Sequence, residues 1–94
     1  MVKLVRYWIE FSLEDNFSGK ILRRSGAKLG CGVTAYTEED AMYILEKELF
    51  PSTGVPKIKS IEANIDVNTL DEKHVRPNMG VVSNRGIWFP FRGV

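Results

Sequence analysis

Apolar and polar residues alternate along two stretches of the chain. In residues 3–13 one set of alternate positions is apolar: Val5, Tyr7, Ile9, Phe11 and Leu13. In residues 57–67 the corresponding set is Ile61, Ala63, Ile65 and Val67. Because the side chains of a strand point alternately to opposite faces, each stretch is predicted to form a strand with one buried face.

Residues 38–49 follow a longer period. Their apolar positions recur at the spacing of one helix face: Ala41, Ile44, Leu45 and Leu49, widened by Met42. Thr37 is suited to accept a hydrogen bond from a free backbone N–H at the helix start, and three acidic residues follow it. Pro51 ends the pattern, since proline cannot continue a helix. One amphipathic helix is therefore predicted to cover a sheet.

Residues 25–36 combine small side chains with a β-compatible core. This composition predicts a bent or bulged strand that another backbone approaches closely. The turn-forming residues 14–19 lie before it, and residues 20–24 between them are a candidate return strand.

The last third of the chain is less regular. Residues 69–72 have the spacing of a capping box, with Thr69 first, and predict a single helical turn that ends at position 73 or 74. Residues 79–83 are a candidate short strand. Residues 87–91 are predicted to be extended at a sheet edge, because Pro90 cannot donate to a strand ladder.

These elements predict an α+β fold, in which a mainly antiparallel sheet of four to five strands packs on one helix as a two-layer sandwich. The 94 residues match the size of one domain, so residues 1–94 are assigned to a single domain. A single helix covers only one face of the sheet.

The charge balance is close to neutral, with 13 Lys and Arg against 12 Asp and Glu. A net charge of +1 provides no global field for a polyanion. Residues 37–50 stand out, because they carry five acidic residues and one basic residue. The single cysteine, Cys31, excludes an intrachain disulfide, and no apolar run has the length of a signal peptide or a membrane span. The expected location is the cytoplasm, without a membrane partner.

Catalytic and metal-binding chemistry has little support in the sequence. Cys31 is a candidate nucleophile with the only histidine, His74, as its base, but a buried structural cysteine is the favoured interpretation. Asp71 or Glu72 beside His74 offers too few ligands for a metal site. We therefore predict no catalytic residue, no metal and no cofactor, and we favour a binding protein over an enzyme.

A basic stretch in the first third could contact phosphates. Its side chains are Lys20, Arg23, Arg24 and Lys28. Because the domain as a whole is nearly neutral, nucleic acid is the least favoured of the partners.

Aromatic residues near the C-terminus favour an interaction surface. Trp88 and Phe91 lie in a short segment that Arg85 precedes, and aromatic residues and arginine are enriched in contact hot spots. Alternation predicts Trp88 on one face of the segment and Phe89 with Phe91 on the other. Trp8 lies on the polar side of the first strand, so a second apolar patch is expected on the sheet face away from the helix.

The first functional hypothesis is a module that forms a homo-oligomer or binds a protein partner through this aromatic sheet face and the C-terminal tail, with Trp8, Trp88 and Phe91 as anchors. The equally weighted structural alternative is that the tail folds over the face and buries both tryptophans within one chain. The alternative function is a small-molecule binding protein or enzyme, with a pocket between sheet and tail. Its polar contacts would be Arg76, Arg85 and His74.

Two segments resemble a known group of sequences. They are His-Val-Arg-Pro-Asn-Met-Gly at 74–80 and Arg-Gly-Ile-Trp-Phe-Pro at 85–90. They resemble short uncharacterised bacterial proteins, some of them carried on mobile, integron-type gene cassettes, and the resemblance extends over about 32–91. It implies a bacterial cytoplasmic protein and carries no activity or catalytic residue with it.

Overall fold

A computed structural model describes residues 3–12 and 29–90. Its four strands are β1 (Val5–Phe11), β2 (Cys31–Ala35), β3 (Ile58–Ala63) and β4 (Gly86–Phe89), and its helix α2 (Glu38–Ile44) continues into a π-helical turn (Leu45–Leu49). The strands form one sheet in the order β3-β1-β2-β4, and all neighbours are antiparallel. This architecture confirms the predicted α+β sandwich. The candidate return strand at 20–24 lies outside the described residues.

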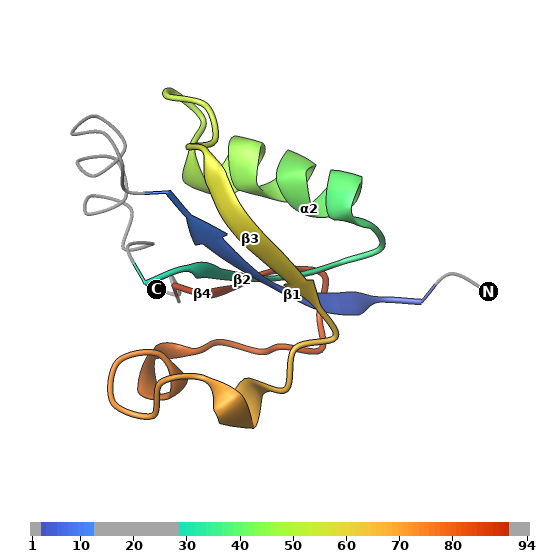
Figure 1. Cartoon of the computed structure of the whole chain (residues 1–94). Coiled ribbons are helices and arrows are strands. Elements are labelled where there is room, and N and C mark those ends of the chain that lie inside the picture. The colour runs from blue at the N-terminus through green and yellow to red at the C-terminus, as the bar shows by residue number, and fades with distance from the viewer. Residues whose placement is uncertain (1–2, 13–28, 91–94) are drawn as a thin grey trace.

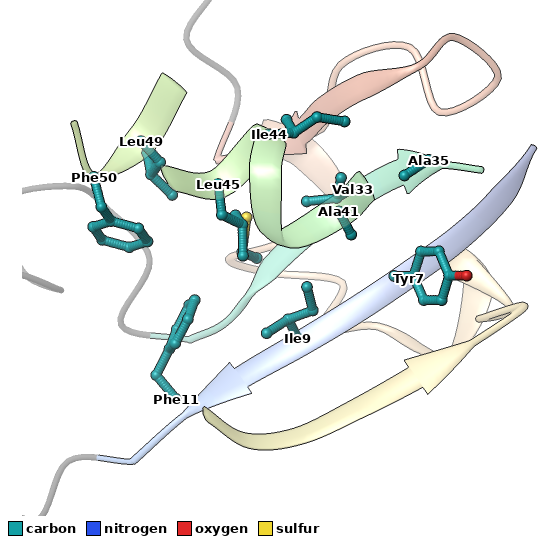
Figure 2. Packing of buried hydrophobic residues seen from close by; sticks show 11 residues of the cluster. Tyr7, Ile9, Phe11, Val33, Ala35, Ala41, Ile44, Leu45, Leu49 and Phe50 are labelled. Atoms are coloured by element: carbon teal, nitrogen blue, oxygen red, sulfur yellow. The ribbon is translucent and has the colours of Figure 1, made fainter. Parts of the chain in front are cut away.

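Helix α2 begins where the sequence predicts. The Thr37 hydroxyl accepts a hydrogen bond from the backbone N–H of Asp40 at 3.0 Å. The predicted apolar face is buried against the sheet in Figure 2: Ala41, Ile44, Leu45 and Leu49. The helix then widens, because the N–H of Phe50 donates to the carbonyl of Leu45 five residues earlier, at 2.9 Å. In this turn Leu49 and Phe50 both stay in the core, where the Phe50 ring meets that of Phe11 edge to face.

The sheet is covered on both faces. Figure 1 shows α2 on one face and the segment after β3 on the other. We call residues 64–82 the cover segment. Under it lies a second apolar cluster, which consists of Trp8, Ile65, Val75, Trp88 and Phe89. The apolar patch predicted on this face is therefore present, and residues of the same chain enclose it.

The predicted strand over 57–67 is too long. Strand β3 ends at Ala63, and Asn64 takes a left-handed conformation with φ of 56°. This reverses the side-chain pattern, so Ile61 packs with the helix-side core while Ile65 is buried in the second cluster. The prediction that Ile61 and Ile65 share one face is wrong, because the left-handed Asn64 lies between them and ends the alternation.

The cover segment is built from short turns rather than from one helical turn. Asp71, not Thr69, caps its central turn: the Asp71 carboxylate accepts the backbone N–H groups of Lys73 at 2.8 Å and His74 at 3.2 Å. Two 3-10 turns flank it, at Val67–Thr69 and Arg76–Asn78. The prediction of a short strand at residues 79–83 is wrong, because no strand forms there. An aspartate suits such a turn, because its short side chain reaches nearby backbone N–H groups.

Strand β4 lies at an edge of the sheet, as Pro90 predicts. Its pairing with β2 is irregular, since Phe89 pairs with Gly32 but Ile87 pairs with the next residue, Val33. Trp88 is the extra residue of this bulge. As a result Trp88 and Phe89 both belong to the second cluster, and the prediction that alternation separates them is wrong.

Gly32 makes room for Trp88. A Cβ atom at Gly32 would overlap the six-membered part of the Trp88 ring, and one at Gly30 would come within 2.6 Å of the Trp8 ring. The predicted bulge therefore occurs at Gly32, although its extra residue belongs to β4. The predicted close approach of another backbone occurs at Gly30, where a Cβ atom would lie 3.1 Å from the carbonyl oxygen of Ile9. Indole rings approach both glycines as well.

We expect the substitution Gly32→Ala to destabilise the fold by about 1–3 kcal/mol, because the new methyl group displaces the Trp88 ring. Urea unfolding of the variant measures this loss. In a Trp88→Leu background the same substitution should destabilise the chain less, since the overlapping ring is gone. An equal loss in both backgrounds would contradict the packing of Trp88 on Gly32.

Candidate interaction surface

The two tryptophans predicted as anchors lie inside the chain. Trp8 is 7% exposed and Trp88 is 0% exposed, and their ring centroids are 6.0 Å apart. The cover segment encloses them, whereas the sequence analysis considered the C-terminal tail for this role. Phe91 lies outside the described residues. Contact between chains through these three side chains stays a prediction.

The polar side chains proposed for a ligand rim are not gathered at one place. Arg76 donates to the carbonyl of Asn68 at 3.4 Å, within the exposed cover segment. His74 Nδ1 lies 3.1 Å from the Asp71 carboxylate, also within that segment. Arg85 instead binds α2, which packs on the other face of the sheet. The three side chains therefore do not form one rim.

Cys31 and His74 do not form a catalytic pair. Cys31 is fully buried in the helix-side core, and burial raises the pKa of its thiol well above the ordinary range. His74 is exposed on the cover segment, on the opposite face of the sheet. Because the thiolate is the nucleophilic form, the burial of Cys31 disfavours its use as a nucleophile.

Two exposed tyrosines flank an ion pair at the start of α2. Tyr36 is 45% exposed and Tyr43 is 53% exposed. Between them the Asp40 carboxylate binds the Arg85 guanidinium through two hydrogen bonds, of 2.9 Å from Nε and 2.5 Å from Nη2. The same guanidinium lies 6.0 Å from the centroid of the Tyr36 ring. One arginine thus fixes both the acid and the ring beside it.

The surface continues along the helix. The Lys47 ammonium donates to the Tyr43 hydroxyl at 3.0 Å and lies 5.3 Å from the centre of its ring. A shallow hollow of about 390 Å³ follows, and its described lining residues are Tyr43, Glu46, Lys47 and Pro51. We call the whole region the tyrosine–arginine surface, defined by Tyr36, Asp40, Tyr43, Lys47 and Arg85.

Acidic side chains surround this surface. Four exposed glutamates of α2 and its π-helical turn form no salt bridge within residues 3–12 and 29–90: Glu38, Glu39, Glu46 and Glu48. Asp40 differs from them, because its hydrogen bonds with Arg85 and with the backbone N–H of Tyr36 lower its pKa to about 2. The uncompensated charge of the region is therefore negative.

Sequence reasoning found only part of this surface. Arg85 was a predicted binding residue, but the two tyrosines were not. Asp40, Tyr43 and Lys47 follow one another at intervals of three and four residues, which is the spacing of one helix face, and Tyr36 precedes the helix cap. That signal was available in the sequence. The contact between Arg85 and Asp40, 45 residues apart, was not.

We expect the substitution Asp40→Asn to lower the melting temperature at neutral pH by a few degrees, because it breaks the pair with Arg85. The pKa of Asp40 is lower in the folded chain than in the unfolded chain, where it is roughly 4. Its contribution is therefore complete above the unfolded value and is lost as the pH falls towards about 2.

Thermal unfolding of both proteins across this acidic range checks the expectation. The gap between the two melting temperatures should be constant from pH 7 to about 5 and should close at lower pH. A gap that persists unchanged at the acidic end would mean that the ion pair is not its origin.

The described part of the chain contains no group of three or more side chains of the metal-binding types. None of its helices has the length and hydropathy that a bilayer span requires. No protein family, curated protein or solved structure matches the chain.

Proposed function

We propose that the chain is an interaction module, rather than an enzyme, that binds a basic, arginine-bearing segment of a protein partner through the tyrosine–arginine surface. The observation that carries this proposal is the exposure of Tyr36 and Tyr43, which lie four residues before and three residues after the ion-paired Asp40. The sequence predicted a partner contact through aromatic side chains. We propose that this contact uses the tyrosines on the helix side of the molecule, where aromatic rings are exposed.

The surface is held in position before a partner arrives. Lys47 restrains the Tyr43 hydroxyl, and Arg85 is fixed by Asp40 beside the Tyr36 ring. Ordering side chains on binding lowers affinity, so rings that are already restrained lose less on association. Tyrosine and arginine are also the residue types most enriched in the energetic centres of interfaces.

The charge of the surface favours a cationic partner. The four glutamates without a salt bridge attract basic side chains and steer their approach. Arginine fits better than lysine, because its flat guanidinium stacks on aromatic rings while it binds carboxylates. The geometry of Arg85 beside Tyr36 and Asp40 is an internal example of this arrangement.

We also propose a cellular location and an origin for the chain. The single cysteine, buried and free, supports a reducing compartment, and we assign the chain to the cytoplasm. The resemblance of its two C-terminal segments supports a bacterial origin on a mobile gene cassette.

We expect a short peptide of alternating arginine and serine to bind more tightly than the matched lysine–serine peptide, by roughly two- to five-fold. Fluorescence anisotropy of the labelled peptides at low salt measures both affinities. The double substitution Tyr36→Leu and Tyr43→Leu should remove the preference for arginine but leave the salt-dependent attraction. Val81→Ala, at an exposed residue outside α2, is the matched control and should change neither.

Three results would contradict the proposal. One is equal affinity for the two basic peptides, which would indicate attraction by charge alone. Another is a preference for arginine that survives the loss of both tyrosines. The third is a dimer of the chain by itself in analytical ultracentrifugation that the tyrosine substitutions dissociate, because a second copy would then be the occupant of the surface.

A further inference from the structure

The indole N–H of Trp88 is a buried donor without an acceptor. Trp88 is 0% exposed, and its Nε1 atom has no hydrogen-bond partner in the described part of the chain. The neighbouring Trp8 is different, because its Nε1 donates to the Glu10 carboxylate at 3.1 Å. Buried donors are almost always paired, so the Trp88 N–H marks a place where an acceptor is missing.

The surroundings of Trp88 are apolar. The side chains packed in and around the second cluster are hydrocarbon, aromatic or thioether groups: Trp8, Ile65, Val67, Leu70, Val75, Met79, Val82 and Phe89. A buried water needs about two to four polar partners. The Thr34 hydroxyl and the Trp8 N–H at this layer already have acceptors, so the Trp88 N–H is left as the unpaired donor among the described side chains. An apolar molecule with a single acceptor matches such a layer better than water does.

The cover segment is joined to the sheet only near its ends. The N–H of Ile65 donates to the carbonyl of Arg6 at 3.2 Å, and the N–H of Gly80 donates to the carbonyl of Trp88 at 2.7 Å. Close to the second of these bonds, the Thr34 hydroxyl donates to the carbonyl of Val82 at 2.6 Å. These three bonds hold the segment at its two attachment points.

Between these points, the hydrogen bonds that residues 66–79 make with the described part of the chain all stay within the cover segment. Only apolar side chains hold this middle part on the sheet, and Val75 is its one buried residue. Low burial and local hydrogen bonding are the features of segments that open at low free-energy cost. The middle part can therefore lift from the sheet without breaking a hydrogen bond to it.

We propose that the layer between the sheet and the cover segment binds a small, uncharged, flat aromatic molecule with one hydrogen-bond acceptor. The acceptor takes the Trp88 N–H, and the ring of the molecule lies against Trp8 and Phe89 where Val75 now packs. The molecule is uncharged because the Glu10 carboxylate, which meets the cluster at Trp8, already accepts the Trp8 N–H, and an unpaired charge is expensive to bury. This site is on the opposite face of the sheet from the tyrosine–arginine surface.

Nuclear magnetic resonance of the whole chain tests the proposal. The chain has two tryptophans, so its ¹H–¹⁵N spectrum holds two indole signals. The substitution Glu10→Gln, which alters the partner of Trp8 alone, distinguishes them. The probes are acetophenone, whose carbonyl is one acceptor on a flat ring, and ethylbenzene, which has a similar shape and no acceptor.

We expect acetophenone to move the Trp88 indole proton downfield in a saturable manner and to bind at least about five-fold more tightly than ethylbenzene. The substitution Trp88→Phe, which keeps an aromatic ring, should abolish the preference for acetophenone. The comparison of the two probes on the unaltered chain stands even if that variant does not fold. The proposal is overturned if the Trp88 signal does not move up to the solubility limit, or if the two probes bind equally.

Discussion

The contact of the Trp88 ring with the backbone of Gly32 organises one whole side of this molecule. Gly32 has no side chain, so the indole can lie directly on β2. The bulge in β4 adds the residue that makes this possible, because it turns Trp88 and Phe89 to the same face. Together with Trp8 they form an aromatic layer that one helix could not cover, and the cover segment encloses it.

The enclosure of that layer determines which surface is free to act. Both tryptophans are internal, so the accessible aromatic rings among the described residues are those of Tyr36, just before α2, and Tyr43 within it. The ion pair of Asp40 with Arg85 connects this helix to the start of β4. Strand β4 thus contributes Trp88 to the buried cluster on one face of the sheet. Arg85, the residue before β4, connects it on the other face to the surface proposed for partner binding. The second cluster differs from this surface, because it contains a buried hydrogen-bond donor without an acceptor, the Trp88 N–H.

The elements with a clear period were predictable from the sequence. Strand β1, helix α2, the hydroxyl cap at Thr37 and the edge position of β4 all follow from local patterns, and they suffice to predict the α+β class. The errors came from single residues that shift a pattern. Asn64 reverses the faces after β3, and the extra residue in β4 does the same before Phe89. Asparagine is enriched in the left-handed conformation, but its presence alone does not fix where a strand ends. The extra residue in β4 has no signal in composition.

The site was predictable to a smaller extent. Arg85 was identified as a binding residue from its neighbours in sequence, yet its partner Asp40 lies in another element. Burial was the other obstacle, since aromatic residues serve equally as interface anchors and as core. The two tryptophans belong to the core of the described chain, and the two tyrosines do not. Only the course of the cover segment distinguishes these outcomes.

Acrylamide quenching of tryptophan fluorescence tests whether the cover segment encloses the two tryptophans within one chain. The measurement is made at nanomolar concentration, where association between chains is negligible. We expect blue-shifted emission and weak quenching for both tryptophans, because the cover segment shields them. A fully quenchable tryptophan with red-shifted emission would show that the aromatic layer is open to solvent, and the account would be wrong.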